Sequence, residues 1–193
     1  MSTSAIILAA GKSSRMGKPK ALLKWNGKTF LENIYQNLEK AGAEKIVIVT
    51  NKSIYSLIQP SHFPVLAINP NPEQGMLSSF RCGLRALEST VANVMLCLTD
   101  HPAVKAETYK ILIENAKKND IIIPKYNGRR GHPVIFGSNF IPELLENDCP
   151  EGARTIVHAH PESIVEIEIN DKGVLLDIDT PAEAKQAGVD IVL

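Results

Sequence analysis

Short, wholly apolar runs separated by polar loops are the feature that most restricts the fold of this chain. The first run, Ser4–Ala10, ends at a glycine, and Lys45–Thr50 and Val94–Leu98 end at polar residues. A strand without polar alternation is buried on both faces, which is typical of a parallel sheet covered by helices on both sides. The sequence predicts further strands at Phe63–Ile68, Asp120–Pro124, His132–Phe136 and Ser163–Ile169.

Amphipathic segments between these runs predict helices. Thr29 and Glu32 form a capping box ahead of a helix that runs to about Ala41, where Gly42 ends it. Other helices are expected at Leu77–Leu87, Lys105–Lys117, Ile141–Asn147, Ala153–His160 and Pro181–Ala187. Strands that alternate with helices pair in parallel through right-handed crossovers. We therefore expect an α/β fold with a three-layer, Rossmann-like, mostly parallel sheet whose ligands bind beyond the carboxyl ends of the strands.

Length, charge and cysteine usage restrict the class of protein. The 193 residues fit one domain, 1–193, and the 21 basic residues balance 21 acidic ones. A nucleic-acid-binding domain usually has a basic excess, and no apolar run reaches membrane-spanning or signal-peptide length. The cysteines lack metal-ligand spacing and indicate a reducing compartment: Cys82, Cys97 and Cys149. We expect a cytoplasmic protein with no nucleic-acid or membrane partner.

The loop after the first strand combines small residues with four cations, Lys12, Arg15, Lys18 and Lys20. Backbone N–H groups beside small residues can approach a ligand closely, and nearby cations favour a polyphosphate. Five residues separate Gly11 from Gly17, which excludes a Walker A loop, and the dinucleotide fingerprint is absent as well. The alternative interpretation is a solvated, lysine-rich surface loop.

Acidic residues follow one buried strand and precede a late helix. Asp100 lies at the carboxyl end of the apolar run Val94–Leu98, while Asp177 and Asp179 come just before Pro181. When two phosphorylated molecules react, an Mg2+ held by carboxylates and phosphate oxygens can neutralise their charges. Alternatively, Asp100 caps the helix at Lys105–Lys117, and Asp179 or Thr180 caps the helix at Pro181.

The loop resembles the nucleotide-binding signature of the MobA-like nucleotidyltransferases, L-A-[AG]-G-x-S-x-R-M-G-x-x-K. It matches at Leu8, Ala9, Ala10, Gly11, Ser13, Arg15, Met16, Gly17 and Lys20. The resemblance implies that the backbone of Leu8–Gly11 contacts base and ribose, while Arg15 and Lys20 hold the triphosphate. Lys18 is the alternative second cation. It also implies Asp100 and Asp179 as ligands of Mg2+, with Asp177 in reserve.

Three further strings resemble elements of the molybdenum cofactor cytidylyltransferases. NPNPEQGMLSSFRCGL carries four residues that the resemblance assigns to the nucleotide site: Asn69, Gly75, Ser78 and Ser79. YNGRRGHPVIF and EGARTIV carry the residues assigned to a phosphorylated acceptor: Arg129, Arg130, His132 and Arg154. Each string also has a structural alternative. The two serines would cap a helix, the arginine pair would lie at an exposed hairpin tip, and Arg154 would cap its own helix.

The implied reaction joins CTP to molybdenum-bound molybdopterin and gives the cytosine dinucleotide cofactor and pyrophosphate, with Arg15, Lys20 and Asp100 catalytic. The base preference depends on Ala10, where guanylyltransferase relatives usually carry glycine, because a Cβ there would crowd a purine. One alternative is a transferase that uses GTP or another acceptor such as a sugar phosphate. Another is a chaperone that delivers a pterin cofactor to an apo molybdenum hydroxylase.

Overall fold

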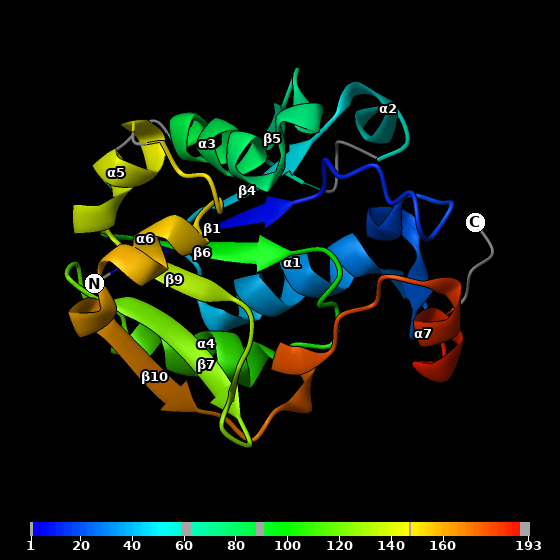
Figure 1. The fold of residues 1–193 in the computed structure, drawn as a ribbon. Coiled ribbons are helices and arrows are strands. Elements are labelled where there is room, and N and C mark those ends of the chain that lie inside the picture. Colours follow the sequence, from blue (N-terminus) through cyan, green and yellow to red (C-terminus); the bar gives the residue numbers. More distant parts are fainter. Residues whose placement is uncertain (1, 59–62, 88–90, 147, 190–193) are drawn as a thin grey trace.

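A central sheet lies between two layers of helices in the computed structural model, which describes residues 2–58, 63–87, 91–146 and 148–189 (Figure 1). Its strands are β1 (Thr3–Leu8), β4 (Ile46–Thr50), β5 (Leu66–Ile68), β6 (Asn93–Leu98), β7 (Ile121–Tyr126), β8 (Arg129–Arg130), β9 (Val134–Gly137) and β10 (Ile164–Glu168). The order is β10-β7-β9-β6-β1-β4-β5, with β8 paired to β7. Four pairs are parallel, and β9 is antiparallel to both neighbours. The predicted α/β, mostly parallel sheet is confirmed.

Each face of the sheet packs against its own group of helices. The helices α1 (Phe30–Ala41) and α4 (Ala106–Asn115) cover one face, and α3 (Met76–Ala86), α5 (Ile141–Glu146) and α6 (Arg154–Ala159) cover the other (Figure 1). Within β1, Ile7 belongs to the first core and Ile6 to the second. This burial on both faces is the reason that β1 is apolar throughout.

Local signals place most helix and strand ends correctly. The capping box of α1 is present, with Glu32 N donating to Thr29 Oγ1 at 3.1 Å, and Gly42 ends the helix at a φ of 83°. The predicted strand Phe63–Ile68 is shorter than expected, because Pro64 has no N–H to donate. Helix α4 is also shorter than predicted at both ends. Of the predicted helix Ile141–Asn147, the last residue lies outside the described residues.

Two Asn-Gly dipeptides make tight hairpins. Asn127 and Gly128 have φ values of 50° and 74° and reverse the chain between β7 and β8. A two-residue turn can connect only antiparallel strands, which explains why β8 and β9 run against β7. Asn26 and Gly27, with φ values of 52° and 78°, likewise join β2 (Lys24–Trp25) to β3 (Lys28–Thr29). This second hairpin and the short helix α2 (Lys52–Tyr55) are not among the elements predicted from the sequence.

The C-terminal segment returns to the loop that follows β1, where helix α7 (Pro181–Gln186) lies beside that loop (Figure 1). A third small core joins the two, formed by Met16, Leu23, Phe30, Ile178, Ala184 and Val189. In addition, Ile178 N donates to Asp100 O at 2.9 Å. These contacts bring the last carboxylates of the chain to the end of β6. Among the described helices, none has the length and apolarity needed to cross a membrane.

Gly83 lies where α3 crosses the sheet, and we expect Gly83→Ala to lower the free energy of unfolding by about 1–3 kcal/mol. The new Cβ would lie 2.5 Å from Ile6 Cγ2 and 2.9 Å from Val49 Cγ2, so the helix must move away from the sheet. Urea unfolding followed by circular dichroism measures the change. Gly11→Ala is the matched control, because a Cβ there meets no atom within 4 Å. Equal midpoints for the two variants would contradict this packing.

Candidate active site

The loop after β1 is folded back on itself and directs two cations inward. Ser13 has a φ of 49°, its carbonyl accepts from Met16 N and Gly17 N, and its Oγ accepts from Lys20 N at 3.1 Å. The Met16 side chain is 4% exposed and anchors the loop in the third core. Arg15 and Lys20 therefore project from a loop whose shape is set by its own hydrogen bonds and by this anchor.

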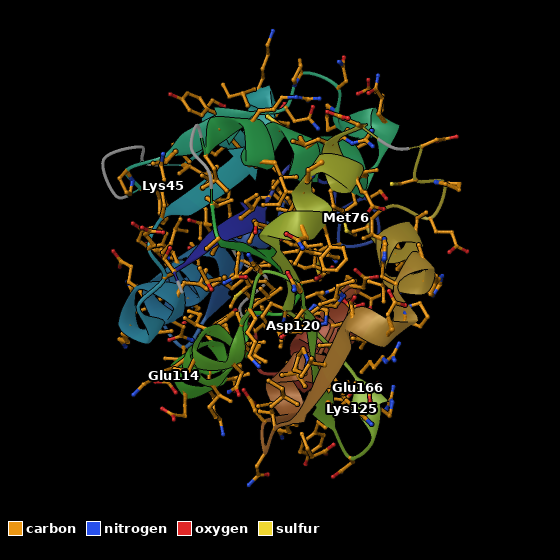
Figure 2. All side chains as sticks on the ribbon, turned by 90° about the vertical axis from the view of Figure 1, so that its left-hand side faces the viewer. Lys45, Met76, Glu114, Asp120, Lys125 and Glu166 are labelled. Atoms are coloured by element: carbon orange, nitrogen blue, oxygen red, sulfur yellow. The ribbon has the colours of Figure 1, made fainter. Side chains whose placement is uncertain are left out.

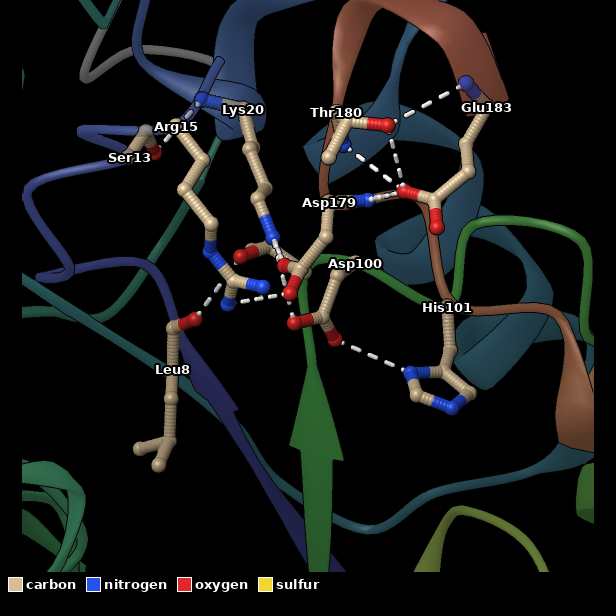
Figure 3. A network of polar contacts seen from close by, with 10 residues as sticks. Leu8, Ser13, Arg15, Lys20, Asp100, His101, Asp179, Thr180 and Glu183 are labelled. Atoms are coloured by element: carbon tan, nitrogen blue, oxygen red, sulfur yellow. Dashed lines mark hydrogen bonds and ion pairs between the residues drawn. The ribbon is translucent and has the colours of Figure 1, made fainter.

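The two predicted cations meet the two predicted metal ligands (Figure 3). Lys20 Nζ lies 3.4 Å from Asp100 Oδ2 and also contacts Asp179 Oδ1. Arg15 Nη2 forms an ion pair with Asp179 Oδ2, and the Arg15 side chain remains 70% exposed. The structure thus brings two cations of one loop together with aspartates that lie 80 and 159 residues beyond Lys20.

Neither of these two aspartates is a helix cap. Lys105 is the N-cap residue of α4, and Asp171 Oδ2 accepts there from Lys105 N at 2.9 Å and from Thr108 Oγ1 at 2.7 Å. Thr180 caps α7 in a second capping box with Glu183. The helix cap predicted at Asp179 or Thr180 is therefore made by Thr180, Asp100 does not cap α4, and both aspartate side chains face the cluster.

Asp100, Asp177 and Asp179 form an oxygen-rich group that fits a divalent cation. One carboxylate oxygen from each lies within 4.8 Å of the others. Burial, with the neighbouring carboxylates of Asp100 and Asp179, raises the pKa of Asp177 above its ordinary value. Burial alone would raise the pKa of Asp100, but His101 and Lys20 outweigh it and lower that pKa. Carboxylate oxygens are the donors that Mg2+ and Mn2+ prefer, so these three side chains suit either ion.

A cavity of about 350 Å³ lies over the loop and the carboxyl ends of β1 and β6. Its lining includes these residues predicted to bind the nucleotide: Leu8, Ala9, Ala10, Gly11, Gly75 and Ser79. The protein itself uses some of their backbone groups, because Thr99 Oγ1 donates to Leu8 O and Asn51 Nδ2 donates to Ala10 O at 2.8 Å. These two bonds hold the wall of the cavity in place.

Asn69 and Ser78 lie outside this smaller cavity, on the lining of a larger one. Asn69 is 4% exposed, and its Nδ2 donates at 2.9 Å to the hydroxyls of both Ser78 and Ser79. The described residues contain no side-chain cap for the first turn of α3, which begins after Gly75 at a φ of 92°. The serines therefore do not cap α3. Instead, their hydroxyls accept from Asn69, which connects the end of β5 to the start of α3.

The larger cavity, about 1540 Å³, is lined by the four residues predicted to bind an acceptor: Arg129, Arg130, His132 and Arg154. Arg129 and Arg130 do form a hairpin tip, yet both reach the cavity. Glu166 of the edge strand β10 binds Arg130 Nε at 2.6 Å and Lys125 Nζ at 2.8 Å; Lys125 and Glu166 lie side by side in Figure 2. The two cavities share Arg15, Asp100 and Asp179, so the carboxylates lie where they meet.

Over residues 5–164 the chain matches the family model of the MobA-like NTP transferase domain. It belongs to this family. A probable molybdenum cofactor guanylyltransferase of Bacillus cereus (strain Q1) is 34% identical over 143 residues, which cover 72% of this chain and 70% of that protein. The nicotine blue oxidoreductase of Paenarthrobacter nicotinovorans is 26% identical over 186 residues, 91% of each chain.

Solved structures share the fold of this MobA-like domain. Rv0371c from Mycobacterium tuberculosis H37Rv superposes with a TM-score of 0.84 at 24% identity and covers 97% of both chains. Another crystal structure of Rv0371c, in complex with manganese, gives a TM-score of 0.79 at 20% identity and covers 97% of this chain and 98% of that one.

Two side chains of this MobA-like domain, His101 and Asn51, contact the site although no sequence pattern predicted a role for them. His101 Nδ1 donates to Asp100 Oδ1 at 2.9 Å, and the His101 ring lies edge-on to His132 with centroids 5.0 Å apart. Asn51 holds Ala10 from a position 41 residues away. The contact between His101 and Asp100 could have been expected, because the two residues are adjacent in the sequence. No local sequence pattern predicts the contact between Asn51 and Ala10.

His132 is a neutral group in this site. Burial, with His101 and Arg154, lowers its pKa to about 4 against the opposing effect of Asp100. Among the residues that the structure describes, its Nδ1 has no hydrogen-bond partner. A neutral imidazole binds a ligand by hydrogen bonding, so the cationic part of the predicted acceptor set is its three arginines.

We expect the imidazole resonances of His132 to stay constant from pH 8 down to about pH 5 in an NMR titration, since its pKa is about 4. The ordinary pKa is 6.5, so below that pH the unfolded chain takes up a proton that the folded chain does not. This residue therefore lowers the free energy of unfolding as the pH falls from 6.5 toward 4. A midpoint near 6.5 for His132 would contradict the prediction.

Proposed function

We propose that this chain is a nucleotidyltransferase that transfers CMP from CTP to molybdenum-bound molybdopterin, giving molybdopterin cytosine dinucleotide and pyrophosphate. The observation that supports it most is the meeting of two cavities at Asp100 and Asp179, beside Arg15 and Lys20. A group transfer between two bound molecules needs this arrangement, because the reacting atoms must approach each other at one point.

The smaller cavity takes the nucleotide. Its loop directs Arg15 and Lys20 toward the carboxylates, where the triphosphate of a bound nucleotide would pass. Asp100 and Asp179, with Asp177 beside them, would hold Mg2+, which supplies charge neutralisation for two anionic reactants. Arg15 and Lys20 bind the β- and γ-phosphates and stabilise the negative charge of the departing pyrophosphate.

The larger cavity takes the acceptor. Arg129, Arg130 and Arg154 offer planar donor groups that suit a terminal phosphate. An oxygen of that phosphate attacks the α-phosphorus, a new P–O bond forms, and the bond to the β-phosphate breaks as pyrophosphate leaves. The attacking oxygen is already ionised near neutral pH, so the neutral His132 orients the acceptor by a hydrogen bond and does not remove a proton.

Ala10 supports cytosine as the base. Its Cβ belongs to a residue only 1% exposed, and the Asn51 hydrogen bond fixes the adjoining carbonyl. A rigid wall with an added methyl group favours the smaller pyrimidine. The second candidate is GTP, because a relative that covers most of this chain carries the name guanylyltransferase.

We expect pyrophosphate release with Mg2+ and molybdenum-loaded molybdopterin to be faster with CTP than with GTP, ATP or UTP, each supplied to the same enzyme. Ala10→Gly should then raise the relative rate with GTP by roughly tenfold, the effect of one or two methylene-sized contacts. Fastest turnover with GTP would keep the reaction and overturn the base assignment. Binding of a nucleotide without turnover would instead favour another phosphorylated acceptor or a carrier that serves a molybdenum hydroxylase.

We expect Lys20→Ala and Asp100→Asn to lower kcat by roughly 100- to 1000-fold, because each removes charge stabilisation of the transition state. Lys12→Ala is the matched control, since Lys12 is an exposed cation of the same loop. Steady-state pyrophosphate release measures kcat, and urea unfolding shows whether each variant remains folded. A near-normal kcat at saturating substrate would remove that residue from the mechanism. Lys18→Ala, compared with Lys20→Ala, distinguishes the two lysines as phosphate ligands.

A further inference from the structure

We infer that His101 is a positioning residue of the carboxylate cluster, which holds one oxygen of Asp100 so that the other faces a divalent cation. This inference rests on the proposed function and adds to it a residue that none of the sequence motifs assigned. His101 follows Asp100 directly at the end of β6 and lies on the side of that carboxylate away from Lys20 (Figure 3).

The two oxygens of Asp100 face different partners. Oδ1 lies 2.9 Å from His101 Nδ1, whereas Oδ2 lies 3.4 Å from Lys20 Nζ. The same Lys20 nitrogen contacts Asp179 Oδ1, so Asp100 Oδ2 and Asp179 Oδ1 lie on either side of one cationic group. A cation between the aspartates would therefore meet Oδ2, while His101 keeps Oδ1 occupied.

The His101 ring is itself held in place. Its side chain is 11% exposed, and its ring packs edge-on against His132 at an interplanar angle of 63°. Its backbone N–H donates to Leu98 O at 3.2 Å, and His132 N donates to Val174 O at 2.9 Å. Backbone contacts thus fix both histidines, and the imidazole has little freedom to follow a rotating carboxylate.

The chemistry of the pair requires a donor at Nδ1. An ionised carboxylate can only accept, so Nδ1 of His101 carries a proton and donates it to Asp100 Oδ1. Partners that orient a ligating carboxylate are worth about 10- to 100-fold in metal affinity, since without them the ligand must be ordered when the ion binds. In a His101→Asn variant the amide nitrogen would lie close to the position of Nδ1 and could still donate to Asp100. In a His101→Gln variant the amide nitrogen would lie farther from the backbone, away from that position.

The test is the affinity for Mn2+ alone, measured by the electron paramagnetic resonance of the free ion in the absence of nucleotide and acceptor. We expect His101→Phe and His101→Gln to raise the dissociation constant by about 10- to 100-fold, and His101→Asn to stay within about threefold of the unaltered protein. His158→Phe is the matched control, because the His158 side chain is 64% exposed and pairs with Glu151. Circular dichroism and urea unfolding establish that each variant is folded.

The outcomes separate this inference from the function on which it rests. If the unaltered protein binds Mn2+ and all three His101 variants bind equally well, the positioning role is overturned and the metal site stands. If the unaltered protein does not bind Mn2+, or if Asp179→Asn binds Mn2+ equally well, the metal assignment is overturned together with the inference. If His101→Phe fails to fold, the contrast between His101→Asn and His101→Gln decides, and equal Mn2+ affinities for those two variants would overturn the positioning role.

Discussion

One backbone hydrogen bond, from Ile178 N to Asp100 O at 2.9 Å, sets the geometry on which the candidate active site depends. It fastens the C-terminal segment to the end of β6, and the small core around Met16 and Ile178 fastens the same segment to the loop after β1. Apolar packing and backbone bonding thereby force Asp179 against Asp100. Like charges held together in this way favour any cation that enters between them.

Two kinds of cation can neutralise the neighbouring carboxylates of Asp100 and Asp179. Lys20 and Arg15 already form ion pairs with Asp179, and a hard divalent ion would bind the same oxygens. Because the cations come from a loop with its own internal hydrogen bonds, they lie close to any polyphosphate that approaches the carboxylates. A site arranged before its ligands arrive can stabilise developing charge without reorganisation.

The acceptor side depends on a departure from parallel order. The Asn-Gly turn after β7 makes β8 and β9 return against it, which carries Arg129, Arg130 and His132 over the carboxyl end of the sheet. At the break between β8 and β9, the backbone near Val174 approaches so closely that Gly131 has no room for a Cβ. The hairpin and the C-terminal segment thus form one wall of the larger cavity.

The sequence by itself determined the buried strands, the capping box of α1 and the cationic loop, because each depends on residues a few positions apart. Only the tertiary structure decided that Asp171, and not Asp100, accepts from the first residue before α4, that Asn51 holds the carbonyl of Ala10, and that His101 contacts both Asp100 and a second histidine. Hydrogen-bond partners separated by tens of residues become neighbours only when the layers pack. The choice among several chemically suitable partners then depends on which of them the folded backbone places within about 3 Å.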